Sequence, residues 1–136
     1  IFSEFISLFR INIMTDQDTQ KINTNEVWCK DGIVRYIIAA PVDEKEATRL
    51  DSVGEEFVNK GEASFVLIDI MQSKEFSSGA RKIWVKFLQN SKIKKTAIFG
   101  GNVFVRTLAS FVIAAAGNAS IKFFETEQQA LDWLHS

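Results

Sequence analysis

The sequence predicts an α/β fold: a mostly parallel central sheet that begins with an N-terminal hairpin and carries helices packed on it. The first observation is a pair of apolar segments joined by Asp31-Gly32. The second is that short apolar runs and amphipathic stretches alternate after this pair, with short links between them. Alternation of this kind requires crossover connections and hence parallel strands. The expected order of elements is ββαβαβαβα.

The hairpin is expected at residues 24–40, with strands at 24–30 and 33–40. Asp-Gly between two apolar runs is a strong hairpin signal, because Gly tolerates the positive φ of a tight turn. Pro41 ends the second strand. Residues 1–23 are expected to be a leader that is either disordered or docked, with residues 1–20 dispensable for the fold. The domain itself is expected to span residues 24–136.

The first helix is expected between Asp43 and Gly61. Asp43 and Glu46 have nearly the spacing of a capping box, and Gly61 stands where a helix C-cap belongs. Apolar residues recur between them at helical spacing: Ala47, Leu50, Val53 and Phe57. The run at 64–70, SFVLIDI, is nearly continuous and apolar, which is typical of a central strand buried on both faces.

The second helix begins after Ser77 or Ser78, either of which can serve as its N-cap. One apolar face follows, made of Ala80, Ile83, Trp84, Phe87 and Leu88. A buried strand is expected at 95–100, and the next helix runs from Asn102 to Gly117. The last strand covers 121–124, and a capping box of Thr126 and Gln129 opens the final helix.

The composition excludes several classes of function. Sixteen basic and seventeen acidic residues nearly cancel, whereas nucleic-acid binders have a basic excess, so no nucleic-acid partner is expected. The chain has one cysteine, Cys29, and one histidine, His135, beside its last residue. A Ser-His-Asp or Cys-His site needs a positioned base, which a penultimate histidine rarely supplies. We therefore expect no enzyme, no catalytic residue, no cofactor and no metal site.

No membrane span is expected either. The longest apolar run outside residues 1–13 extends from Leu108 to Gly117. A membrane-spanning helix needs roughly 20 such residues. The single cysteine fits a reducing compartment, and the expected location is the cytoplasm.

Residues 65–88, FVLIDIMQSKEFSSGARKIWVKFL, resemble the STAS domain, a family named after sulfate transporters and anti-sigma-factor antagonists. In that family a buried strand ends in Asp, and an Asp-Ser-Ser/Thr-Gly motif opens the next helix. Here Asp69 ends the strand, and Ser77, Ser78 and Gly79 stand at the head of the helix. Phe76 replaces the acidic residue of the motif. The AIFGG and KFFETEQQALDWL segments are similar to divergent STAS-like proteins of unknown role.

The resemblance implies a bacterial regulatory module that binds a protein partner or a second copy of itself as a homodimer. It also implies a phosphorylation switch at the head of the second helix, with Ser78 as the first candidate acceptor and Ser77 as the second. The switch loop and partner surface would comprise Asp69, Ser73, Phe76, Gly79, Arg81 and Lys82. Structural roles are the alternative: a helix cap for the serines, a turn-fixing carboxylate for Asp69, and a solvated face for Arg81 and Lys82.

The second candidate function is a carrier or sensor of a small apolar or lipid-like ligand, since STAS folds resemble CRAL-TRIO lipid carriers in topology. Trp84 and the apolar face of the third helix would line its cavity, and that face comprises Phe104, Leu108, Phe111, Val112 and Ala115. Core packing is the alternative role for these residues. Gly100-Gly101-Asn102 lacks the spacing of phosphate-binding motifs, so we interpret it as a tight strand-to-helix turn.

Overall fold

The computed structural model of the chain describes residues 24–117 and 119–136, except for the side chains of Val103, Phe104, Val105, Leu108 and Phe111. The described elements are β1 (Glu26–Lys30), β2 (Ile33–Ile37), α2 (Glu44–Asn59), β3 (Phe65–Asp69), α3 (Ser78–Leu88), β4 (Lys95–Phe99), α4 (Val103–Ala116), β5 (Ile121–Phe124) and α5 (Glu127–Leu134). This is the order ββαβαβαβα that the sequence predicts. The expectations for residues 1–23 lie outside the described residues.

The strands form one five-stranded sheet in the order β1-β2-β3-β4-β5. β1 pairs with β2 antiparallel, and every later neighbour is parallel. Asp31 and Gly32 have φ values of 54° and 76°, as the two central residues of a type I′ hairpin turn require. The predicted hairpin and the mostly parallel sheet are both confirmed.

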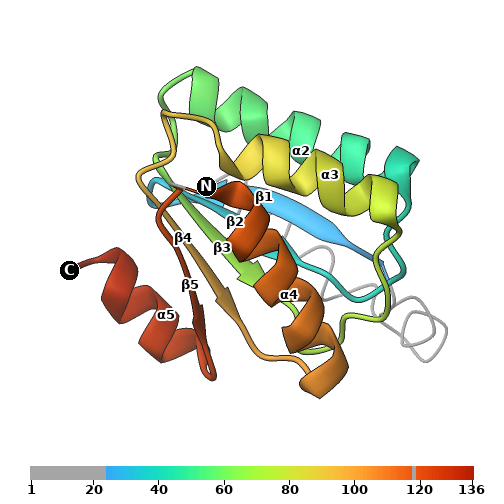
Figure 1. The fold of residues 1–136 in the computed structure, drawn as a ribbon. Coiled ribbons are helices and arrows are strands. Elements are labelled where there is room, and N and C mark those ends of the chain that lie inside the picture. Colours follow the sequence, from blue (N-terminus) through green and yellow to red (C-terminus); the bar gives the residue numbers. More distant parts are fainter. Residues whose placement is uncertain (1–23, 118) are drawn as a thin grey trace, which may run out of the picture.

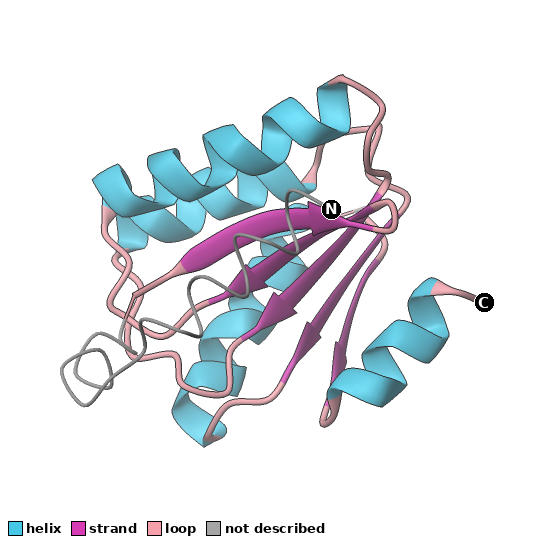
Figure 2. Ribbon diagram, turned by 180° about the vertical axis from the view of Figure 1, so that it is seen from behind, coloured by secondary structure: helices cyan, strands magenta, loops and turns pink. Residues whose placement is uncertain are grey.

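Helices cover the two faces of the sheet unequally. α2, α3 and α4 pack on one face, and α5 packs on the other, against β3, β4 and β5 (Figures 1 and 2). Because side chains alternate along each strand, the sheet supplies two separate cores. Val34, Val66 and Ile98 face the three-helix side. Leu67 and Phe99 face α5.

The helices begin where the sequence places their caps. Asp43 accepts a hydrogen bond from the Glu46 amide at 2.8 Å. The Thr126–Gln129 capping box is complete at the start of α5. The strand predicted at 33–40 is shorter, ending at Ile37. The amides of Ala39 and Ala40 donate to the Asn25 side chain rather than continuing the sheet ladder.

Of the face predicted for the third helix, Val112 packs against the core, Ala115 does not, and the side chains of Phe104, Leu108 and Phe111 lie outside the described residues. Ala115 is exposed, whereas Ala116 is buried and Ala109 packs against the core. α4 is apolar on nearly all sides, so its periodicity could not identify the side that faces the sheet. Among the described residues, no helix is long and apolar enough to cross a bilayer.

Candidate functional site

The head of α3 and the head of α2 lie side by side at one end of the molecule (Figure 1). A parallel bridge between Val42 and Phe76 joins the segments that lead into them. The Val42 amide donates to the Glu75 carbonyl at 2.9 Å, and the Ser77 amide donates to the Val42 carbonyl at 3.0 Å. The loop before α3 is thus fastened to the residue before the α2 N-cap.

The two candidate phosphoacceptors have different environments. Ser77 is the N-cap of α3, and its Oγ accepts a hydrogen bond from the Ala80 amide at 3.0 Å. Ser78 is the first residue of the helix and is exposed. In the described part of the chain, no hydrogen bond engages the Ser78 hydroxyl. Modification at Ser77 would alter the oxygen that caps α3, whereas the Ser78 hydroxyl is not part of that cap.

Gly79 lies against a side chain from the other helix. A Cβ built on Gly79 would collide with the carboxylate and the Cγ of Glu44, the first residue of α2. Glu44 therefore lies directly over the first turn of α3. Glu44 was not among the residues singled out from the sequence, and no local pattern connects positions 44 and 79.

Phe76, which stands where the family motif has an acidic residue, has a structural role. Its ring is half-buried, packs against the core and lies 6.3 Å from the Trp84 ring, centroid to centroid. Its backbone forms the bridge to Val42. The acidic-to-aromatic change thus gives the loop an apolar anchor at this position.

The rest of the loop divides into exposed and buried parts. Asp69 accepts a hydrogen bond from the Met71 amide at 2.9 Å, which fixes the turn after β3. Burial is the main cause that raises the pKa of the Asp69 carboxyl, and the nearby Glu127 carboxylate adds to it. Ser73 is only 6% exposed, so its side chain is not on the predicted partner surface.

Met71 is the exposed apolar residue of this region, with 64% of its surface accessible. A Cβ on Gly100 would collide with the Met71 side chain. Gly100 and Gly101 also have φ values of 87° and 90°, so the turn before α4 needs glycine on two grounds. Sequence reasoning did not select Met71, because an apolar residue after a buried strand also fits the core.

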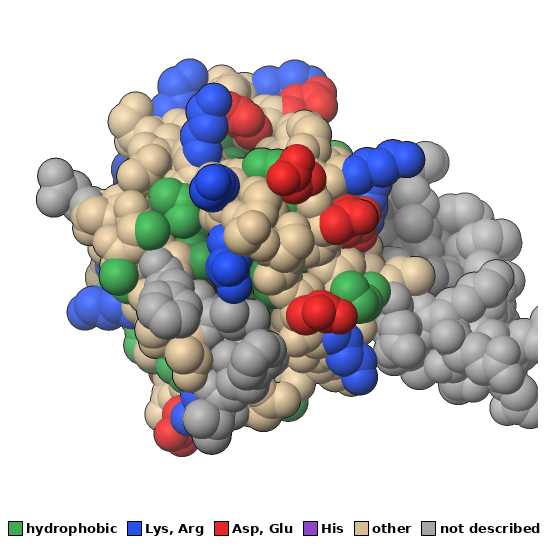
Figure 3. Space-filling model, turned by 45° about the vertical axis from the view of Figure 1, so that its right-hand side comes forward, with side chains coloured by type: hydrophobic (Ala, Val, Ile, Leu, Met, Phe, Trp, Pro, Cys, Tyr) green, Lys and Arg blue, Asp and Glu red, His purple; other side chains and the backbone are tan. Residues whose placement is uncertain are grey.

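The two basic residues on α3 differ in burial. Arg81 is half-buried and borders an apolar pocket, whereas Lys82 is exposed. Figure 3 shows acidic and basic side chains interspersed with small hydrophobic areas over one face of the molecule. A molecule that bound to this face would contact both positive and negative side chains.

The apolar pocket lies between α3, α4 and the sheet. Its lining comprises Ile68, Ile70, Phe76, Arg81, Trp84, Leu88, Ile98, Ala109 and Val112. Of the predicted lining residues whose side chains are described, Trp84 and Val112 line this pocket and Ala115 does not. The pocket has a volume of about 40 Å³. A dry apolar cavity that binds benzene measures about 150 Å³, so the space left between the described side chains is the smaller of the two.

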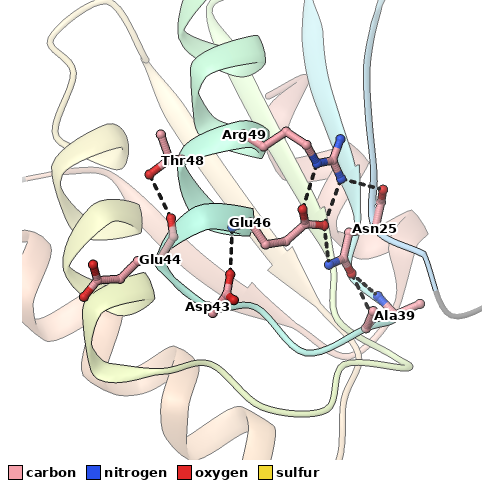
Figure 4. A network of polar contacts seen from close by, with 8 residues as sticks. Asn25, Ala39, Asp43, Glu44, Glu46, Thr48 and Arg49 are labelled. Carbon is pink, nitrogen blue, oxygen red and sulfur yellow. Dashed lines mark hydrogen bonds and ion pairs between the residues drawn. The ribbon is translucent and has the colours of Figure 1, made fainter.

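A polar network fastens the head of α2 to the hairpin (Figure 4). The Asn25 amide donates to Glu46 Oε2 at 2.9 Å, and Asn25 Oδ1 accepts from the amides of Ala39 and Ala40 at 2.8 and 2.9 Å. The Arg49 guanidinium pairs with both Glu46 carboxylate oxygens. This is the main cause that lowers the Glu46 pKa. Asn25 was not identified from the sequence because its bonding partners are distant in the chain.

Within the described residues, no cluster of His, Cys, Asp and Glu could hold a metal ion. Cys29 is half-buried, and its thiol pKa is raised mainly by burial. His135 follows α5 as its C-cap. The start of α3 is surrounded by a helix cap, a turn and exposed side chains. Such a surface can bind another molecule through these side chains.

A hairpin-led parallel sheet, with a Ser-Ser-Gly helix head at the carboxyl end of its central strand, defines a STAS-type domain. The chain belongs to the SpoIIAA-like family, whose sequence profile matches residues 33–135. A comparison with curated proteins gave no match.

Solved structures with the same fold include three of different origin. SpoIIAA, the Bacillus cell fate determinant in its phosphorylated form, has a TM-score of 0.61 and 10% identity, covering 82% of this chain and 99% of its own. An anti-sigma factor antagonist of Mycobacterium paratuberculosis has a TM-score of 0.64 and 16% identity, covering 83% and 94%. A Shewanella loihica protein with a SpoIIAA-like fold has a TM-score of 0.59 and 20% identity, covering 82% of this chain and 92% of its own.

Proposed function

We propose that this chain is a regulatory protein-interaction module of the bacterial cytoplasm that binds its partner through the head of α3. The observation that carries the proposal is the Ser-Ser-Gly helix head, with Ser78 exposed beside a cap that is already satisfied. Its membership of the SpoIIAA-like family supports a role in binding another protein. We assign it no catalytic step.

The proposed partner surface consists of Met71, Ser78, Arg81 and Lys82. Met71 supplies an apolar contact at the rim of the loop. Arg81 and Lys82 supply positive charge one turn into α3. A large flexible apolar side chain beside charged groups is typical of surfaces that bind other proteins.

Ser78 is the proposed switch residue. A phosphoserine would carry nearly two negative charges at the positive end of the α3 dipole. The fold should tolerate that charge, since the helix end favours it. A partner that packs an acidic or apolar surface on the same turn would lose affinity, because it would meet a like charge or would bury an unpaired one.

Affinity capture from the native source, followed by mass spectrometry and phosphosite mapping, tests this proposal. We expect a partner that wild type retains and that Met71→Ala and Lys82→Ala lose. Lys92→Ala is the matched control, since Lys92 is exposed beyond the opposite end of α3. Equal recovery by all four proteins would contradict the proposed surface. Equal partner affinity of Ser78→Asp and Ser78→Ala would remove the switch and leave the surface.

The alternative function, a carrier of an apolar or lipid-like ligand, depends on the pocket beside Trp84. Between the described side chains, the pocket has a volume of about 40 Å³. The interaction module is therefore the function that the geometry supports better. Sedimentation velocity of the pure protein would separate a homodimer from a module that binds another protein.

A further inference from the structure

One carboxylate, that of Glu44 at the start of α2, lies against the start of α3. Asp43 and Ser77, the two N-caps, directly follow the bridged residues Val42 and Phe76. Glu44 is the first residue of α2, and its carboxylate lies against Gly79 in the first turn of α3. The two helix heads are thus joined by a backbone bridge and by a side-chain contact.

The charges at these helix ends are arranged unequally. The first turn of α2 contains Glu44 and Glu46, whereas the first turn of α3 contains no acidic residue of its own. Unpaired amides at a helix start favour a nearby negative charge. The Glu44 carboxylate belongs to the first turn of α2 and lies against the first turn of α3, so its charge is placed near both helix starts.

We propose that Glu44 transmits a change of charge at Ser78 to the first turn of α2. A negative group at Ser78 competes with the Glu44 carboxylate for the same helix end and repels it. Glu44 then leaves its place over Gly79. The same carboxylate supplies favourable negative charge to the first turn of α2, so its displacement destabilises that turn. The use of this coupling in regulation rests on the proposed function, but the coupling itself is a property of the free protein.

The contacts of α2 indicate where the disturbance stops. In the same turn, the side chain of Glu46 is held by Asn25 and by Arg49 (Figure 4). Those bonds connect α2 to β1 and to the end of β2. The response should therefore be confined to the amides of Glu46, Ala47 and Thr48, and the hairpin should remain closed.

Hydrogen exchange of the free protein, followed by NMR or by mass spectrometry of peptides covering 43–50, tests the proposal. Ser78→Asp should speed exchange in this segment by about twofold to fivefold, the equivalent of a helix-end charge interaction of about 0.3–1 kcal/mol. In the Glu44→Gln background, the same Ser78→Asp change should have no such effect. Circular dichroism of each variant verifies that it folds.

Glu75→Gln is the matched control, because it removes an exposed charge from the same loop, whereas the three atoms nearest to a Cβ at Gly79 all belong to Glu44. In that background Ser78→Asp should still speed exchange at 43–50. Unchanged exchange in Ser78→Asp, or the same increase with Glu44→Gln, would overturn the proposal. Either result would leave the partner surface untouched, since that surface is tested by capture of the partner.

Discussion

Lys95 Nζ lies 3.0 Å from the carbonyl oxygen of Trp133 and so ties the end of α5 to the first residue of β4. It also donates to the carbonyl and the hydroxyl oxygens of Ser136, both at 3.1 Å. The same ammonium lies 5.2 Å from the centre of the Trp133 ring. One side chain therefore satisfies carbonyls at a helix end, where positive charge is favoured.

Lys95→Met should lower the free energy of unfolding by about 1–2 kcal/mol, because charged hydrogen bonds to α5 are lost while the apolar stem is kept. Lys122→Met is the control. Lys122 Nζ lies over the same ring, also at 5.2 Å, but makes no hydrogen bond in the described part of the chain. Its replacement should change stability by less than about 0.5 kcal/mol. Urea unfolding measures both, and equal losses would contradict this role of Lys95.

Trp84→Ala should destabilise the domain by roughly 3–5 kcal/mol, as large aromatic deletions in cores do. The Trp84 side chain is 3% exposed and lies 4.8 Å from the Tyr36 ring, centroid to centroid. Trp28→Ala is the matched control, since Trp28 is 36% exposed on β1. Thermal or urea unfolding should rank the two variants clearly, and similar losses would mean that Trp84 is not central to the core.

Asp51→Asn should stabilise the protein at neutral and alkaline pH. Asp51 is 3% exposed, neither carboxylate oxygen has a partner among the described residues, and burial raises its pKa to about 9. The folded state then holds the proton more tightly than the unfolded state does. Stability contributed by the neutral carboxyl is complete below the ordinary pKa of 3.8 and falls as pH rises toward about 9.

Urea unfolding between pH 5 and 8 measures this dependence. Wild type should lose up to about 1.4 kcal/mol for each pH unit through Asp51. Asp51→Asn should remove that part of the slope. A carboxyl resonance of Asp51 that titrates near pH 4, or an unaltered slope in the variant, would show that the group ionises freely.

Asn25→Ala should destabilise by about 2–3 kcal/mol, because it leaves the buried Ala39 amide without an acceptor. It also removes the bond to Glu46. Asn59→Ala is the comparison, since Asn59 accepts one exposed hydrogen bond, from Asn90 at 3.2 Å. That variant should change the free energy of unfolding by no more than about 0.5 kcal/mol. Equal stability of the two variants would show that the hydrogen bonds of Asn25 do not stabilise the fold more than that exposed bond does.

The elements of this fold could be predicted because local signals determine them. Asp31-Gly32 adopts the turn its sequence demands, and Ser77 caps the helix that follows it. The site could be predicted only in part. Glu44 reaches Gly79 and Asn25 reaches Ala39 through tertiary packing, and neither pair leaves a periodic signal. The family resemblance suggested Ser73 as part of the switch loop and partner surface, but the structure buries its side chain in the turn after β3.

The bridge between Val42 and Phe76 has a consequence for the energetics of recognition. Two backbone hydrogen bonds hold this loop to the segment before α2. The loop therefore loses little conformational entropy when a partner binds to it. Binding should then be close to rigid-body association, and the association rate constant should depend on the orientation of the partners and on their electrostatic attraction. Differences in affinity among variants of this surface should accordingly appear in how long the complex lasts.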